Sequence, residues 1–219
     1  MCQNHSLSQS DCCLICCEPL LKDVSFVHLI TYQPICIRCF SQLHIYDWDI
    51  TFHHYPLHIL YEYNDFFQTL LFQYKGLYDY ALKDAFLCFQ LQELKRKYRH
   101  YMIVVTPSSV EDNEKRGFAP MEAIAKTFSS HVFTGLYKKE KYKQSDLTYV
   151  QRIMMKNKIG IKNGEVLKGK KVLIIDDVIT SGQTLLSCIQ VVEEQRPRLI
   201  ECLVLSTKRR REDFVTKGE

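Results

Sequence analysis

The chain has 219 residues, of which 46% are hydrophobic and 25% charged, and its formal net charge is +4. This composition is typical of a folded globular protein and excludes an intrinsically disordered chain. The longest stretch without a charged residue, residues 178–192, is too short to span a bilayer as a helix. The first residues lack the basic start and apolar run of a secretory signal, so we expect a cytoplasmic protein with reduced cysteines.

Six of the ten cysteines fall within residues 12–39. In a reducing compartment, cysteine pairs at fixed spacing are typical of metal ligands rather than of disulfides. Two Cys-x-x-Cys knuckles have the spacing of a structural site in which four thiolates hold one zinc ion. The predicted ligands are Cys13, Cys16, Cys36 and Cys39.

The register of the first knuckle stays open, because pairs that use Cys12 or Cys17 also satisfy the spacing of zinc ligands. A thioredoxin-like redox pair is an alternative for one knuckle. It would need a surrounding βαβ unit, which the front end of this chain does not offer.

Beyond residue 45 the sequence alternates between strand and helix patterns. Short apolar or β-branched runs predict buried strands at residues 55–63, 102–105, 132–136, 172–175 and 199–205. Apolar residues at helical spacing predict helices over residues 65–74, 78–98, 122–129 and 185–192. We therefore predict an α/β protein with a largely parallel sheet, divided into a zinc-knuckle module (1–45) and a main domain (46–219).

The most informative segment is residues 172–184, VLIIDDVITSGQT. A buried strand ends at Asp176 and Asp177, a small polar loop with Gly182 follows, and a helix then begins. The N–H groups of residues 180–184 would lie in the first turn of that helix, where unpaired donors and the helix dipole favour phosphate. Gly182 would let the backbone approach the anion. The two carboxylates can accept hydrogen bonds from ribose hydroxyls or hold Mg²⁺ through water.

This segment resembles the phosphoribosyl pyrophosphate (PRPP) loop of type I phosphoribosyltransferases, in which hydrophobic residues precede two acidic residues, a spacer and Thr-Ser/Thr-Gly-x-Thr. One alternative is a strand-to-helix turn without a ligand. Another is a receiver domain, but a receiver carries its acidic pair near its start. The resemblance implies that Asp176 and Asp177 hold the ribose at the reacting centre. It also implies a phosphate-binding loop made of Val178, Ile179, Thr180, Ser181, Gly182, Gln183 and Thr184.

Weaker motifs occur in the order seen in one branch of this fold. They are Tyr74-Lys75-Gly76, residues 106–108, residues 115–118, and residues 143–145 with Arg152 and Asn157. Together with the four-cysteine front end, they make residues 12–207 resemble the ComF family of late competence proteins. The resemblance implies that Lys75 and Arg116 meet the pyrophosphate of PRPP.

Two departures from that family pattern bear on catalysis. Family members usually continue Arg-Gly-Phe with Asn-Gln, whereas Ala119 and Pro120 follow Phe118 here. The loop near Thr106 usually carries a second proline. Both changes fall where pyrophosphate and a second substrate would bind, so they weaken the prediction of catalysis more than the prediction of the fold.

Cations gather in clusters, and tyrosines interrupt several of them. Solvated loops and helix ends are one explanation of such clusters. The other is single-stranded nucleic acid, since cations follow phosphates while rings stack on bases. The resemblance favours single-stranded DNA. The candidate contacts are Lys138, Lys139, Lys208, Arg209, Arg210 and Arg211.

Two functions of different classes follow. The one we favour is a bacterial competence factor in natural transformation, which handles incoming single-stranded DNA beside the ATP-driven uptake helicase and DNA-processing proteins. It would carry a pocket for PRPP or a related sugar phosphate and be recruited to the membrane uptake machinery through partners. The alternative is a working phosphoribosyltransferase that transfers ribose 5-phosphate from PRPP to a base or an amine. Structural zinc is expected in both, Mg²⁺ only together with PRPP, and a homodimer is a candidate assembly.

Overall fold

The computed structural model of the protein describes residues 12–20, 33–139 and 159–214. Its main sheet has six strands in the order β1-β2-β8-β7-β3-β4. β1 (Ile45–Phe52) and β2 (Tyr55–Glu62) form an antiparallel hairpin at one edge. The parallel strands that follow are β8 (Leu199–Thr207), β7 (Lys171–Ile179), β3 (Tyr101–Val105) and β4 (Val132–Phe133). The prediction of an α/β protein with a largely parallel sheet is confirmed.

The remaining elements surround this sheet. The helices are α1 (Ile37–Gln42), α2 (Asp65–Gly76), α3 (Leu91–Lys97), α4 (Val110–Arg116), α5 (Pro120–Phe128) and α7 (Gln183–Glu193). Short 3₁₀ turns are η4 (Tyr80–Asp84), η6 (Gly164–Leu167) and η7 (Arg211–Phe214), and β5 (Leu136–Lys138) pairs with β6 (Ile159–Ile161) in a small antiparallel sheet. Within the described ranges, none of the helices is long and apolar enough to cross a membrane.

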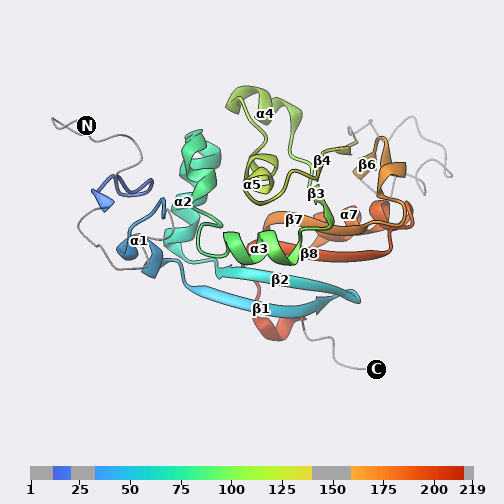
Figure 1. Ribbon diagram of the computed structural model, residues 1–219, viewed down its shortest axis with the longest axis horizontal. Helices are drawn as coiled ribbons and strands as arrows, with labels where there is room; N and C mark the ends of the chain where they lie inside the picture. The colour runs from blue at the N-terminus through green and yellow to red at the C-terminus, as the bar shows by residue number, and fades with distance from the viewer. Residues whose placement is uncertain (1–11, 21–32, 140–158, 215–219) are drawn as a thin grey trace, which may run out of the picture.

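The sheet separates two hydrophobic layers because side chains alternate along each strand. On β7, Leu173 and Ile175 pack in the cluster that contains residues of α2, α3 and α5. Their neighbours Val172 and Ile174 pack in the cluster that contains the buried face of α7. Figure 1 shows α2, α4 and α5 rising on one side of the strands. A continuous apolar run in β7 is therefore needed, since both of its faces are covered.

The cysteine-bearing front end is joined to the main body by packing. Cys13, Cys36, Cys39 and Leu43 belong to the same buried cluster as the residues of α2, α3 and α5. In Figure 1 the front end and α1 lie at the end of the molecule next to α2, away from β6. Loss of order in the front end would therefore expose part of the main hydrophobic core.

The structure differs from the sequence predictions in several elements. The single helix predicted over 78–98 is divided into η4 and α3, because Phe86 and Leu87 between them are buried in the core outside any helix. β1 and α4 were not predicted, and the strand predicted over 132–136 is divided between β4 and β5. β7 also continues past the acidic pair to Ile179, so the polar loop is shorter than predicted.

Candidate functional site

A polar cavity of about 280 Å³ opens at the carboxyl ends of β3 and β7. After β3 the chain passes to α5, which packs in one hydrophobic layer, whereas after β7 it passes to α7 in the other layer. Ligand sites of open α/β sheets form where neighbouring strands send their connections to opposite faces. The lining residues are Lys75, Thr106, Pro107, Ser108, Ser109, Asp112, Arg116, Pro120, Met121, Lys138, Asp176, Asp177, Val178 and Thr184.

The acidic pair lies on one side of this cavity and is held by hydrogen bonds. Oδ1 of Asp176 accepts from the hydroxyl of Thr106 at 2.7 Å and from the backbone N–H of Asp177 at 2.9 Å. Oδ1 of Asp177 accepts from the N–H of Val178 at 2.7 Å, and its Oδ2 forms an ion pair with Nζ of Lys75. Burial raises the pKa of Asp176, although the Thr106 hydroxyl and the charge of Lys75 act in the opposite direction.

Lys75 reaches the cavity from the last turn of α2. Arg116 of α4 fixes this region, because its Nε donates to the backbone carbonyl of Lys75 at 2.9 Å and its Nη1 donates to Asn113 at 3.1 Å. Burial lowers the pKa of Lys75 to about 8, with the charges of Arg116 and Lys138 acting in the same direction and that of Asp176 opposing them. The structure therefore brings the two predicted pyrophosphate contacts, Lys75 and Arg116, to the predicted acidic pair.

The predicted phosphate loop divides between three elements. Val178 and Ile179 end β7, Thr180 and Ser181 are exposed, and Thr184 stands in the first turn of α7 and lines the cavity. Gln183 is the first residue of α7, and its N–H donates to Oγ of Ser181 at 3.4 Å. The N-terminus of an eleven-residue helix thus faces the side of the cavity that carries Thr184, as an anion site requires.

Gly182 is required for a reason that the sequence did not reveal. It caps α7 in the left-handed conformation, with φ of +80°. A Cβ at this position would lie 2.7 Å from Cζ of Phe52 in the β1–β2 hairpin. The missing side chain of Gly182 therefore lets Phe52 of the hairpin pack against the loop. Replacement of the glycine would disturb this packing as well as anion binding.

Of the two residues that replace amide side chains of the family pattern, Pro120 lines this cavity, whereas Ala119 is not among its lining residues. Pro120 forms part of the wall at the start of α5, together with Met121. The carbonyl of Pro120 accepts from the hydroxyl of Tyr74 at 2.7 Å. This part of the wall is therefore apolar, and the hydrogen bond from Tyr74 holds it in place.

Thr106 is the site residue whose role sequence reasoning missed. It appeared in a weak motif, but its contact with Asp176 depends on β3 and β7 being neighbours. A hydroxyl residue directly after a buried strand was the available signal. Lys138, which was predicted as a nucleic-acid contact, lines the same cavity from β5.

The four predicted zinc ligands come together in the front end. The sulfurs of Cys13, Cys16, Cys36 and Cys39 all lie within 4.8 Å of one another. Sulfurs around a tetrahedral zinc ion with Zn–S bonds of about 2.3 Å are separated by about 3.8 Å, so the set fits this ion. The backbone N–H of Cys36 donates to Sγ of Cys13 at 3.3 Å, a contact that stabilises a thiolate. Cys12 and Cys17 are not members of this set, so the clustered sulfurs are those of the two predicted Cys-x-x-Cys knuckles.

The predicted nucleic-acid contacts fall into two places. Lys138 and Lys139 lie at the end of β5, whereas residues 208–211 follow β8 and lead into η7. In the second group, Lys208, Arg209 and Arg211 lie over the rings of Tyr63, Phe214 and Trp48, at 4.3, 4.4 and 5.8 Å from the ring centroids. The other cationic cluster between residues 140 and 158, with Arg152 and Asn157, lies outside the described residues.

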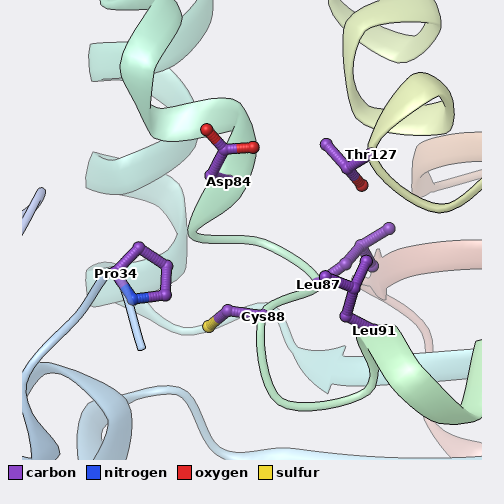
Figure 2. A pocket seen from close by; sticks show the side chains of 6 residues that line it. All are labelled: Pro34, Asp84, Leu87, Cys88, Leu91 and Thr127. Carbon is purple, nitrogen blue, oxygen red and sulfur yellow. The ribbon is translucent and has the colours of Figure 1, made fainter. Parts of the chain in front are cut away.

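A second cavity, of about 250 Å³, lies between the front end and α5 and is largely apolar (Figure 2). Leu87, Cys88 and Leu91 line it together with Pro34, Asp84 and Thr127. Burial raises the pKa of Cys88 to about 12, so this thiol stays protonated. Among the described residues that line this cavity, Asp84 is the one charged side chain, and it already pairs with Lys83.

Comparison with known proteins gives one family match and several similar solved structures. Residues 113–219 match the family model described as a phosphoribosyl transferase domain. A search among curated proteins found no match. Solved structures that are similar include a hypoxanthine phosphoribosyltransferase from Staphylococcus aureus, with 17% identity over 63% of this chain and 68% of that one and a TM-score of 0.39. Another is the hypoxanthine phosphoribosyl transferase of Trypanosoma cruzi, with 14% identity over 63% and 69% and a TM-score of 0.38.

The matched domain and the parallel sheet with its acidic pair define a type I phosphoribosyltransferase fold. To this fold the chain adds a front end with a four-cysteine cluster.

Proposed function

We propose that the protein is a ComF-family competence factor, which binds a PRPP-type sugar phosphate in the polar cavity and handles single-stranded DNA during natural transformation. The observation that carries the sugar-phosphate part is the convergence of the acidic pair, Lys75, Arg116 and the first turn of α7 on one cavity. Carboxylates suit the vicinal hydroxyls of ribose, and the cations with the helix N-terminus suit its phosphates.

The four-cysteine cluster supports the family assignment. Its geometry fits one structural zinc ion, and the family resemblance rests on such a front end joined to a PRPP loop. We assign residues 1–45 to this zinc-knuckle module and residues 46–219 to the phosphoribosyltransferase-like domain. α1 ends at Gln42 and β1 begins at Ile45, which supports a boundary there.

The segment 208–211 supports the DNA-handling part. It combines cations with the rings of Tyr63, Trp48 and Phe214, a combination that suits single strands because rings can stack on bases. The N–H of Lys208 donates to the carbonyl of Ile179 at 3.3 Å, so the segment begins beside the phosphate loop. In this proposal the protein acts in the cytoplasm and reaches the membrane uptake machinery through the helicase and DNA-processing proteins.

A working phosphoribosyltransferase is the alternative. In that reaction the bond between the anomeric carbon and pyrophosphate breaks, and a bond to a nitrogen of the base or amine forms, while the attacking nitrogen gives its proton to solvent. Asp176 and Asp177 would orient the ribose, and Arg116 and Lys75 would receive the leaving pyrophosphate. Mg²⁺, when bound with PRPP, would neutralise the diphosphate. The apolar wall at Pro120 and Met121 offers the second substrate few polar partners, which favours a binding role.

Two calorimetric titrations test the proposal, one with PRPP and one with an oligo-dT strand at low salt. We expect both ligands to bind, and the oligonucleotide to change the fluorescence of Trp48, the one tryptophan of the chain, which lies beside Arg211. Substitution of Thr184 by Val should weaken PRPP binding without affecting oligo-dT, because Thr184 lines the cavity and is not one of the predicted DNA contacts. Release of pyrophosphate from PRPP with an amine or base, together with no binding of oligo-dT, would instead support the transferase.

A further inference from the structure

The carboxylate of Asp177 already has a cation. Its Oδ2 pairs with Nζ of Lys75, while its Oδ1 accepts from the N–H of Val178 at 2.7 Å. The Lys75 side chain is 30% exposed and that of Asp177 18%, so the pair lies inside the cavity rather than on the surface. With Nζ of Lys75 on one oxygen and the N–H of Val178 on the other, this half-buried carboxylate already has its counter-charge, so no metal is needed to neutralise it.

Contacts of the surrounding fold hold the backbone of Lys75 in place, so its side chain starts from a fixed position. Tyr74 before it is fully buried and donates its hydroxyl to the carbonyl of Pro120. The carbonyl of Lys75 itself is held by Nε of Arg116 at 2.9 Å. The C-terminal end of α2 therefore places the ammonium group of Lys75 beside the acidic pair.

The described residues that line the cavity carry equal numbers of positive and negative side chains. Lys75, Arg116 and Lys138 supply three cations, and Asp112, Asp176 and Asp177 supply three carboxylates. Fold relatives are expected to take PRPP with Mg²⁺, which neutralises the diphosphate. In this protein, side-chain cations lie in the same cavity as the acidic pair. One of them, Lys75, forms an ion pair with Asp177, a carboxylate that could otherwise hold a metal.

We propose that Lys75 serves Asp177 as a built-in counter-cation in place of a divalent metal, so that the cavity binds PRPP in its metal-free form. This inference rests on the proposed sugar-phosphate function. Asp176 then meets the ribose hydroxyls, the first turn of α7 holds the 5′-phosphate, and Arg116 and Lys138 neutralise the diphosphate.

The test is a calorimetric titration of the zinc-loaded full chain with PRPP, once with EDTA at a concentration that spares the zinc and once with excess Mg²⁺. We expect the wild-type dissociation constants to agree within about threefold, well below the tenfold or larger effect of one charge-assisted contact. For Lys75→Met, binding in EDTA should weaken at least about tenfold, since the carboxylate of Asp177 then lacks its counter-cation and repels the phosphates of PRPP. Mg²⁺ should restore it, because Asp177 is then free to hold the metal.

A matched control is Lys83→Met, which removes a lysine that pairs with Asp84 at 2.6 Å outside the cavity. This variant should bind PRPP as the wild type does. Titration with Mn²⁺, followed by electron paramagnetic resonance without PRPP, should show an added site in Lys75→Met relative to the wild type.

Three outcomes would overturn the inference. A wild-type protein that binds PRPP only with Mg²⁺ would refute the counter-cation role and leave the proposed function intact. Equal Mn²⁺ binding by the wild type and Lys75→Met would also refute it. A wild-type protein that binds no PRPP under either condition would refute both the inference and the proposed function.

Discussion

Asp176 is the residue at which stability and binding oppose each other most clearly. It ends the buried part of β7, and burial raises its pKa above the ordinary value for a carboxyl group. Such a raised pKa means that the folded state disfavours the charged form. The resulting penalty is absent below the pKa of the unfolded chain and grows as the pH rises from that value to the folded pKa, so it is present at neutral pH and absent near pH 3.

We therefore expect Asp176→Asn to raise the melting temperature at pH 7 and to leave it unchanged near pH 3. The amide oxygen can still accept from Thr106, so the packing is preserved. PRPP affinity should fall about tenfold, because a charge-assisted hydrogen bond to ribose is lost. Calorimetry and thermal melts at both pH values measure this. Asp112→Asn, at the exposed rim of the cavity, serves as the control, and a lower melting temperature for Asp176→Asn at pH 7 would contradict the argument.

At the scale of elements, the segment after β8 divides its cations between structure and surface. The guanidinium of Arg209 covers the ring of Phe214 and donates to the carbonyl of Asp213 at 2.6 Å. It therefore holds η7 against the sheet. Lys208, Arg210 and Arg211 are exposed and are the better candidates for phosphate contacts.

Replacing Lys208, Arg210 and Arg211 by Ala should reduce the steepness of log affinity against log salt for oligo-dT by about 2. Each phosphate contact on a single strand contributes about 0.7 to this slope, and three contacts are lost. Affinity should fall alike for every base sequence, since phosphate contacts carry no sequence information. Fluorescence anisotropy over a range of salt concentrations measures the slope. Replacing the last-turn cations of α3, Lys95, Arg96 and Lys97, removes the same charge elsewhere. Equal effects of the two triple variants would show that binding depends on net charge alone.

At the scale of the whole molecule, the zinc-knuckle module and the main domain depend on each other. Three of the four clustered cysteines belong to the hydrophobic cluster that also contains residues of α2, α3 and α5. Burial raises the pKa of Cys39, so without a metal this thiol stays protonated. The four sulfurs are then no longer held together by a shared ion. Loss of the metal should consequently destabilise the packing of α2, α3 and α5 as well as the front end.

We expect about one zinc ion per chain by elemental analysis, as one four-thiolate set requires. Cys36→Ser should lower the melting temperature of the whole chain by more than about 10 °C, since each kcal/mol lost shifts a chain of this size by about 2–4 °C. Cys17→Ser is the matched control, because Cys17 is exposed and stands outside the cluster. A metal-free protein with an unchanged melting transition would contradict a structural zinc site.

Local patterns in the sequence were sufficient for the parts that depend on neighbouring residues. The apolar run that ends at Asp176, the loop before α7 and the spacing of the cysteine knuckles are all local, and the structure contains each of them. The α/β class followed from the alternation of strand and helix patterns. The fold class and the position of the acidic pair at the end of a buried run could thus be predicted before any contact was known.

Only the tertiary structure decided which distant residues meet at the cavity. Thr106 reaches Asp176 because β3 lies beside β7, and Lys75 reaches Asp177 because α2 packs over the same edge of the sheet. Gly182 is fixed by Phe52, 130 positions earlier in the chain. Such contacts depend on strand order and packing, which local periodicity does not encode. The charge balance of the cavity, and with it the role proposed for Lys75, is for that reason a property of the fold.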